Sequence, residues 1–119
     1  MSIDLAPTIL HAVGLQPPGA MQGINLLDEQ AVRQRKTIFG ACFTHNAVDL
    51  NDPAKNMLWR WTIDGRWKLI VPAPGAKNAA PELYDILADP SEKTDLAADQ
   101  MQTVESLQRG LDKWWQPEP

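Results

Sequence analysis

Two periodic patterns of apolar residues predict helices near the two ends of the sequence. In residues 2–15, Leu5, Ile9 and Val13 recur every four residues, and Gly14 then follows as a helix stop. Asp4 precedes this run and is predicted to cap the helix. In residues 99–115, apolar residues form one stripe of an amphipathic helix, which consists of Met101, Val104, Leu107, Leu111 and Trp114.

Between the two helices, the sequence has the short apolar runs that are typical of β-strands. Residues 37–43 and 82–86 are such runs, and the segment MLWRWTIDGRWKLIV, residues 57–71, contains two more around an Asp-Gly pair. Polar loops are expected over residues 44–55 and 72–81, and one or two polar helical turns over 28–36.

The turn of this hairpin decides which side chains share a face of the sheet. A two-residue turn would place Arg66 and Lys68 on the same face as Trp59 and Trp61. A three-residue loop, 63–65, with Gly65 at positive φ separates the cationic from the apolar side chains, and we therefore predict it. One face then carries Met57, Trp59, Trp61, Trp67, Leu69 and Val71.

These elements predict an α+β fold, in which an antiparallel meander of about four strands packs on one face against the C-terminal helix. The three hairpin tryptophans are expected to meet Leu107, Leu111 and Trp114 in the core. The N-terminal helix has no evident partner within the chain.

Composition narrows the class of protein. The 119 residues fit one domain, with 44% hydrophobic residues, a net charge of −4 and a pI near 5.0. This charge argues against nucleic-acid binding, which needs clustered cations. The single cysteine excludes an internal disulfide and a cysteine-rich zinc site. No apolar run approaches the roughly 20 residues that span a membrane.

The acidic stretch ELYDILADPSEKTDLA, residues 82–97, is the first candidate for a metal or acid–base site. Its carboxylates lack the spacing and the central glycine of a calcium loop. Asp89-Pro90-Ser91-Glu92 instead has the residue types of a type I turn. The sequence therefore favours a turn and helix entry there and no metal site.

His45, in the polar loop after the strand at 37–43, is the better functional candidate, because functional side chains concentrate in loops. A solvated loop histidine remains the alternative. Cys42 with His45 lacks a third group that would orient a nucleophile, and Cys42 is interpreted as a small core residue. We predict no catalytic residue.

Arg60, Arg66 and Lys68 are predicted to form a basic patch on the polar face of the hairpin. Such a patch can hold an anion such as a sulfate or a carboxylate. A solvated sheet face is the simpler interpretation.

Five segments occur in an order that resembles a known family. They are SIDLAPTILHAVGL, MQGINLL, GRWKLIVP, ELYDILADPSEKTDLA and a helix that ends in tryptophan. In residues 2–115 the chain resembles the C-terminal end of a formylglycine-dependent sulfatase of the alkaline-phosphatase superfamily. Asn25, Ile86 and Asp95 stand where serine, leucine and asparagine are usual.

The resemblance implies a division of the chain and a role for each part. Residues 1–36 correspond to the tail end of the large α/β domain, and residues 37–119 to the C-terminal subdomain of antiparallel sheet and helix. The family cleaves sulfate esters with a formylglycine and a calcium ion. The C/S-x-P-S-R motif and the metal ligands are not in this sequence, since Cys42 precedes Phe-Thr-His-Asn. No cofactor is therefore expected in this chain.

We accordingly expect a C-terminal sulfatase fragment with a structural and substrate-rim role, in which His45, Arg60 and Lys68 lie at the rim. Its expected partners are a missing N-terminal sulfatase domain and, in the intact enzyme, a sulfated carbohydrate. The N-terminal helix is expected to self-associate in isolation. Relatives are often exported or periplasmic, and the sequence leaves the compartment of this chain open. The alternative function is a free-standing carbohydrate- or protein-binding module that uses the tryptophan-rich hairpin.

Overall fold

The computed structural model describes residues 1–77 and 79–116. It divides into two compact units, Met1–Lys36 and Thr37–Pro119, and each is described by itself. Among the described residues, no helix has the length and apolar character that crossing a bilayer requires.

The first unit contains two short helices. The 3-10 turn η1, Ser2–Asp4, leads into α1, Leu5–Ala12, and a loop then connects to α2, Glu29–Gln34. Helix α1 ends as predicted, because Gly14 adopts a φ of +79°. Asp28 caps α2 by accepting hydrogen bonds from the backbone N–H groups of Gln30 and Ala31. The polar helical turns expected over residues 28–36 are thus confirmed.

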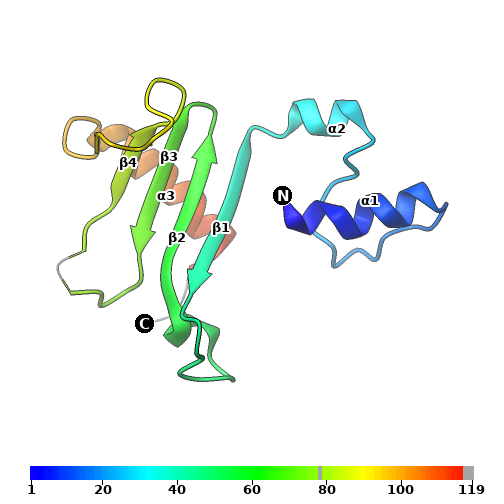
Figure 1. Cartoon of the computed structure of the whole chain (residues 1–119), viewed down its shortest axis with the longest axis horizontal. Coiled ribbons are helices and arrows are strands. Elements are labelled where there is room, and N and C mark those ends of the chain that lie inside the picture. Colours follow the sequence, from blue (N-terminus) through cyan, green and yellow to red (C-terminus); the bar gives the residue numbers. More distant parts are fainter. Residues whose placement is uncertain (78, 117–119) are drawn as a thin grey trace. The chain divides into compact units, whose positions relative to one another are not determined.

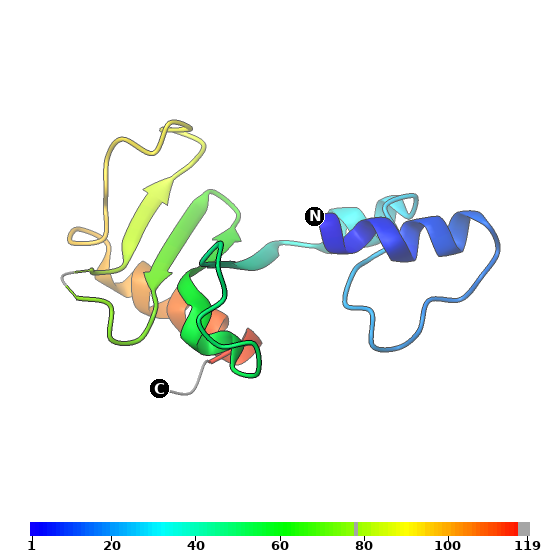
Figure 2. The same ribbon diagram turned by 60° about the horizontal axis from the view of Figure 1, so that its bottom comes forward.

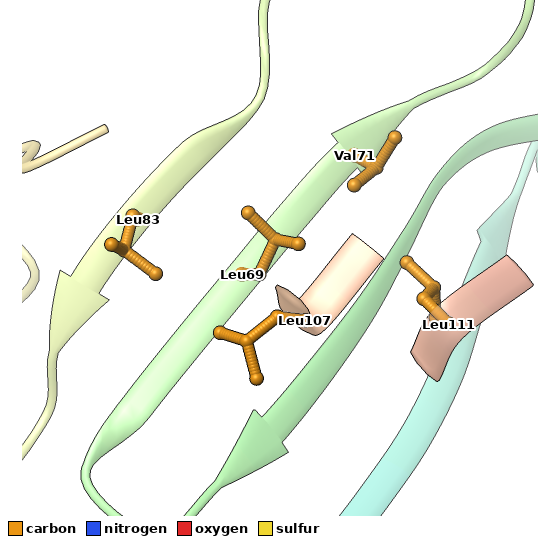
Figure 3. Packing of buried hydrophobic residues seen from close by; sticks show 5 residues of the cluster. All are labelled: Leu69, Val71, Leu83, Leu107 and Leu111. Atoms are coloured by element: carbon orange, nitrogen blue, oxygen red, sulfur yellow. The ribbon is translucent and has the colours of Figure 1, made fainter. Parts of the chain in front are cut away.

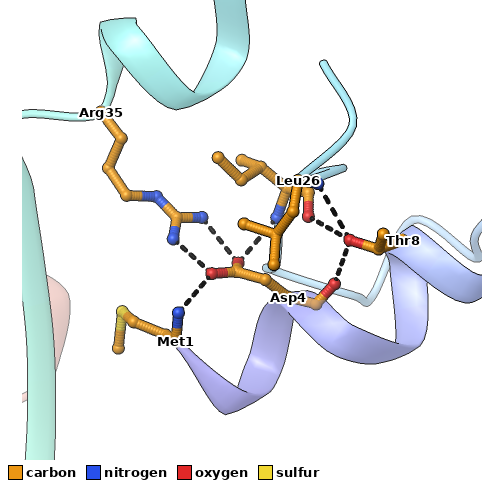
Figure 4. A network of polar contacts seen from close by, with 6 residues as sticks. Met1, Asp4, Thr8, Leu26 and Arg35 are labelled. Atoms are coloured by element: carbon orange, nitrogen blue, oxygen red, sulfur yellow. Dashed lines mark hydrogen bonds and ion pairs between the residues drawn. The ribbon is translucent and has the colours of Figure 1, made fainter. Parts of the chain in front are cut away.

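Asp4 does not cap α1 with its side chain, and this part of the prediction is wrong. Its carboxylate is fully buried and accepts two hydrogen bonds from Arg35, at 2.6 and 2.8 Å, as Figure 4 shows. The backbone N–H of Ile24 and the amino group of Met1 also donate to it. Asp4 therefore connects the start of the first unit, its central loop and the end of α2.

The apolar stripe of α1 is exposed, since Leu5, Ile9 and Val13 have more than half of their surface accessible. The predicted self-association through this stripe stays a prediction.

The Arg35 guanidinium holds the pKa of the Asp4 carboxyl well below its usual range, although burial opposes this. The contribution of Asp4 to stability is complete above the unfolded-state pKa of about 3.9 and is lost as the pH falls further, because only the unfolded chain then takes up the proton. We expect Asp4→Asn to cost about 1.5–3 kcal/mol at neutral pH, and expect this difference from the wild type to shrink in acid. Hydrogen-exchange protection of the Ile24 amide, which donates to Asp4, measures the cost of the substitution at neutral pH and its decrease in acid.

Glu29→Gln is the matched control, because Glu29 forms an exposed ion pair with Arg33 at 3.0 Å. Its effect should stay below about 0.5 kcal/mol. An Asp4→Asn effect that is equally small, or independent of pH, would contradict the structural role of Asp4.

The strands of the second unit form one four-stranded antiparallel sheet in the order β1-β2-β3-β4 (Figure 1). The strands are β1, Thr37–Phe43; β2, Met57–Asp64; β3, Trp67–Pro72; and β4, Glu82–Asp85. The 3-10 turn η2, Pro53–Asn56, precedes β2, and helix α3, Met101–Trp114, lies against one face of the sheet (Figure 2). The predicted α+β fold, a meander with a C-terminal helix, is confirmed.

The predicted register of the hairpin is wrong. Asp64 pairs with Trp67, so the turn consists of two residues, Gly65 and Arg66. Gly65 does adopt a positive φ, +58°, but at the first turn position, where a type II′ turn places glycine. This register places Arg60 opposite Val71, and Lys68 opposite Ile63 on the other face.

The sheet therefore has an inner face, which packs against α3, and an outer face. Figure 3 shows the buried cluster between the inner face and the helix. It consists of Leu69, Val71, Leu83, Leu107 and Leu111. Thr62 lies beside this cluster and is fully buried, with its hydroxyl donating to the carbonyl of Ile38 at 3.1 Å.

The predicted core is correct for Leu107 and Leu111, but Trp114 is 37% exposed, and the prediction holds only partly for the hairpin. Trp67 packs against the cluster, whereas Trp59 is 43% exposed and pairs with Pro72 on the outer face. Trp114 stacks on Phe39 at 5.6 Å, and Met101 is exposed. The position of the side chains follows from the register, because neighbouring residues of a strand point to opposite faces.

The observed register makes a prediction about two adjacent residues. Arg60 is buried, and Arg60→Ala should cost about 1.5–3 kcal/mol, because its charged hydrogen bonds are lost. Trp59→Ser should cost less than about 1 kcal/mol, since Trp59 lies on the outer face. Urea denaturation of both variants tests the register, and a larger cost for Trp59 than for Arg60 would support the three-residue loop.

Candidate functional site

His45 lies in the loop that connects β1 to η2. Its side chain is exposed, and no hydrogen bond among the described residues involves its imidazole ring. The same loop exposes Val48 to 74% and Leu50 to 88%. The loop therefore presents one imidazole and two apolar side chains to solvent.

The conformation of this loop depends on one buried asparagine. The amide oxygen of Asn56 accepts hydrogen bonds from the backbone N–H groups of Val48 and Asp49. Its amide nitrogen donates to the carbonyls of Asp49 and Asp52, at 2.5 and 3.1 Å. The Asn56 carbonyl also accepts from the N–H of Thr44 at 2.7 Å. The four side-chain bonds and the one backbone bond of Asn56 together order the loop without a strand or helix.

Three charged side chains, Lys55, Asp49 and Asp52, form ion pairs within the same loop. Lys55 Nζ lies 3.0 Å from an oxygen of Asp49 and 3.5 Å from one of Asp52. The pKa of the Asp49 carboxyl is lowered, first by the hydrogen bond from the Asn51 backbone N–H and then by Lys55. Asp49 and Lys55 thus both keep their charges at neutral pH. Their ion pair helps to order the loop around His45.

The predicted basic patch of Arg60, Arg66 and Lys68 is wrong, because the structure does not bring these three side chains together on one face of the sheet. Arg60 lies on the inner face of the sheet and Lys68 on the outer face. Arg66 lies in the turn, pairs with Asp85 and stacks over the Trp67 ring at 5.5 Å. The three cations are thus separate, and each has an acidic partner.

Arg60 holds the end of helix α3 against the sheet. One guanidinium nitrogen donates to Asp112 at 2.9 Å, and another donates to the carbonyl of Trp115. Among the residues that the structure describes, its Nε atom has no hydrogen-bond partner. This geometry gives Arg60 a packing role within the sheet–helix unit.

Lys68 is held by both oxygens of Glu92, each at 2.7 Å. Glu92 adopts a φ of +52°, which is uncommon for a residue other than glycine. On the neighbouring strand, Tyr84 donates a hydrogen bond to Glu82, which raises the pKa of Tyr84 to about 12. These side chains form a charged but internally paired edge of the outer face.

The acidic stretch of residues 82–97 is a structural turn, as predicted. The N–H of Glu92 donates to the carbonyl of Asp89 at 3.0 Å, which closes the turn. The carboxylates of Asp85, Asp89 and Asp95 all accept hydrogen bonds from backbone N–H groups. Because these oxygens already have protein donors, the stretch does not fit a calcium ion. Within residues 1–77 and 79–116, no three His, Cys, Asp or Glu side chains cluster as metal ligands would.

Two residues that matter for these sites were not identified from the sequence. Asn56 lies three residues after Pro53 and directly before the strand that begins at Met57. A polar residue at this position was only a weak signal that its side chain orders the preceding loop. Asp112, the partner of Arg60, carried no local signal, because 52 residues separate the two in sequence.

Comparison with known proteins gives consistent results over nearly the whole chain. The family model for the C-terminal region of N-sulphoglucosamine sulphohydrolase matches residues 1–116. Arylsulfatase K of Xenopus laevis is 28% identical over 117 residues, which cover 92% of this chain and 21% of that protein. The mouse protein of the same name is 29% identical over 92% of this chain.

Solved structures share the fold. The yidJ protein of Bacteroides fragilis has a TM-score of 0.69 and 24% identity, over 93% of this chain and 23% of its own. BT4656, solved with its substrate D-glucosamine-2-N,6-O-disulfate, has a TM-score of 0.67 and 22% identity, over 92% of this chain and 22% of its own. The chain thus spans about a fifth of the length of the curated relatives that it matches.

The buried position of Asn56 predicts that its amide group orders the loop around His45. Asn56→Ala should cost about 1–3 kcal/mol, because several backbone groups lose their partner. The amides of Val48 and Asp49 should also lose protection in hydrogen exchange. Asn46→Ala is the matched control, since Asn46 is exposed in the same loop. Unchanged protection of the two amides in Asn56→Ala would contradict this role.

Proposed function

The chain belongs to the family of N-sulphoglucosamine sulphohydrolase C-terminal regions, and we propose that it acts as the C-terminal part of a sulfatase without a catalytic centre of its own. The match over residues 1–116 carries this proposal. The sheet and helix of residues 37–116 complete a larger α/β domain, which supplies the nucleophile and the calcium site. The tryptophan-rich hairpin as a free-standing binding module is not favoured by these relatives.

The chemistry of the described residues supports the proposal that the nucleophile and the calcium site lie in another domain. Cleavage of a sulfate ester needs a strong nucleophile and positive charge on the sulfate oxygens. Here Cys42 lies half-buried within β1, and its sulfur is 4.0 Å from the carbonyl of Phe43. The cations Arg60 and Lys68 are already paired with carboxylates. The chain by itself therefore offers a frame for substrate and not a reaction centre.

At the substrate rim, His45 is the residue that we assign to contact with the substrate. Its imidazole is exposed on a loop that Asn56 keeps ordered, so a hydrogen bond to a ligand costs little loop entropy. A sulfated sugar is the ligand class, because BT4656 has such a substrate. His45 would hydrogen-bond to a hydroxyl or sulfate oxygen of this sugar. Arg60 and Lys68 remain rim candidates only if a substrate displaces Asp112 or Glu92.

The proposal predicts where activity resides. The isolated chain should release no sulfate from an aryl sulfate, and the full-length protein should do so. In the full-length protein, His45→Ala should lower kcat/KM by about 2- to 10-fold, which corresponds to one hydrogen bond, without a change in stability. Steady-state kinetics on a sulfated glucosamine measures this effect.

His11→Ala is the matched control, because His11 is the other histidine of the chain and is exposed on α1. Its kcat/KM should equal that of the wild type. Turnover by the isolated chain would overturn the proposal as a whole, whereas unchanged kinetics in His45→Ala would overturn only the role of His45.

A further inference from the structure

The sheet of the second unit has two edges, and the chain itself closes the edge at β4. Strands β1 and β4 are the edge strands (Figure 1). At β4, the backbone N–H of Leu83 donates to the Asp95 carboxylate at 3.0 Å, and the Leu83 carbonyl accepts from the N–H of Leu96 at 2.8 Å. The carbonyl of Asp85 likewise accepts hydrogen bonds from the turn that follows it. Such contacts prevent an edge from pairing with a further strand.

The register shows which backbone groups of β1 point away from the sheet. In an antiparallel pair, residues that exchange hydrogen bonds alternate with residues that do not. The N–H of Ala73 donates to the carbonyl of Leu58, so the even-numbered residues of β2 bond to β3 and the odd-numbered ones bond to β1. Gly40 pairs with an odd-numbered residue of β2 and therefore bonds to it. The N–H and C=O groups of its neighbours, Phe39 and Ala41, point outward.

The edge of β1 lacks the contacts that close β4. Among the described residues, no hydrogen bond involves the outward N–H or C=O group of Phe39 or Ala41. Residues 37–43 also contain no charged residue and no proline, which are the residues that commonly block edge pairing. A bulge at Cys42/Phe43 interrupts the pairing with β2 only at the end of the strand. β1 is therefore a regular, uncharged edge to which one more strand can be added.

Aromatic side chains line this edge on the inner face. Phe39 stacks on Trp114 with ring centroids 5.6 Å apart, and Phe43 packs against Trp115 at 6.1 Å. Phe43 is 43% exposed and Trp114 is 37% exposed. A strand added to β1 would place its alternate side chains beside these rings and bury more of their surface.

We propose that the edge of β1 pairs with β1 of a second copy of this chain, in the antiparallel direction and centred on Gly40. In this register Phe39 lies opposite the partner's Ala41, and these two residues exchange hydrogen bonds through their outward N–H and C=O groups. A large side chain then lies beside a small one on the inner face, and no like charges face each other.

The strand is thus self-complementary in size and in charge, which identifies a second copy as the occupant. Because both copies use the same surface, the contact is closed by a two-fold axis and produces a dimer with one eight-stranded sheet. The inference uses only contacts within the second unit and does not depend on the proposed function.

Hydrogen exchange at single amides tests this pairing. The amides of Phe39 and Ala41 should exchange rapidly in dilute solution and become protected as the concentration of the chain rises, because they find acceptors only in the dimer. The amide of Gly40, which bonds to β2, should be protected at every concentration and is the internal control. Exchange at Phe39 and Ala41 that does not change with concentration would overturn the proposal.

Ala41→Pro provides a second measurement, by sedimentation. Proline removes an N–H that points away from β2, so the four-stranded sheet keeps its hydrogen bonds while the dimer loses two by symmetry. The Kd of the dimer should rise at least about tenfold. Ala41→Ser keeps the N–H and should dimerise as the wild type does. An unchanged Kd in Ala41→Pro would overturn the proposal, and the exchange experiment decides the matter if this variant does not fold.

A dimer that forms through another surface gives a different result. The exposed apolar stripe of α1 is the alternative contact, and Ile9→Glu disrupts it. The Kd of the dimer should be unaffected by Ile9→Glu. A dimer that persists in Ala41→Pro and dissociates in Ile9→Glu would overturn the proposal in favour of α1. A chain that sediments as a monomer at every concentration would overturn it outright.

Discussion

The pairing of Asp64 with Trp67 across a two-residue turn determines which residues of the sheet meet helix α3. Because strand residues alternate between faces, this single pair directs Thr62 and Arg60 inward and Trp61 and Trp59 outward. The buried cluster, the polar contacts of the helix and the apolar outer face all follow from it. A shift by one residue would bury the tryptophans under α3 and expose Arg60.

The apolar core is small, and polar contacts therefore contribute much of what holds the elements of each unit together. The buried cluster of the second unit has only five residues, so sheet and helix are also joined by Arg60, which binds Asp112 and the Trp115 carbonyl. In the first unit, the ion pair of Asp4 and Arg35 joins the start of the chain to the end of α2. A buried charge without its partner is costly, so each pair also specifies one arrangement of the chain.

The loop of His45 and the outer face of the sheet differ in what fixes their conformation and in the side chains that they expose. The loop is ordered by the hydrogen bonds of Asn56 and presents exposed side chains, which suits contact with a small polar ligand. On the outer face, the Trp61 ring lies over Gly40, in the space that a larger side chain would occupy. The chain spans about a fifth of the length of its curated relatives.

Local signals in the sequence were sufficient for the elements of the fold. Periodicity predicted α1 and α3, short β-branched and aromatic runs predicted the strands, and Gly14, Gly65 and the turn at Asp89 were identified by their residue types. The order of five short segments also indicated the family. These features depend on neighbours within a few residues, so the sequence alone determines them.

Tertiary structure decided the register of the hairpin and, with it, which side chains lie on each face of the sheet. It also decided which charged side chains are buried and with which partners. The three-residue loop was predicted because it separates the cationic side chains from the tryptophans. This reasoning assumed that an arginine would not be buried, and the observed register buries Arg60. The ion pair with Asp112, which is distant in sequence, offsets the cost of burying Arg60. The ion pair with Arg35 likewise offsets the cost of burying Asp4. His45 could be selected from its loop position, but the Asn56 contacts that order the loop could not. The physical reason is that ion pairs and hydrogen bonds between distant residues change the free energy of burying a side chain, and only the folded chain brings those residues together.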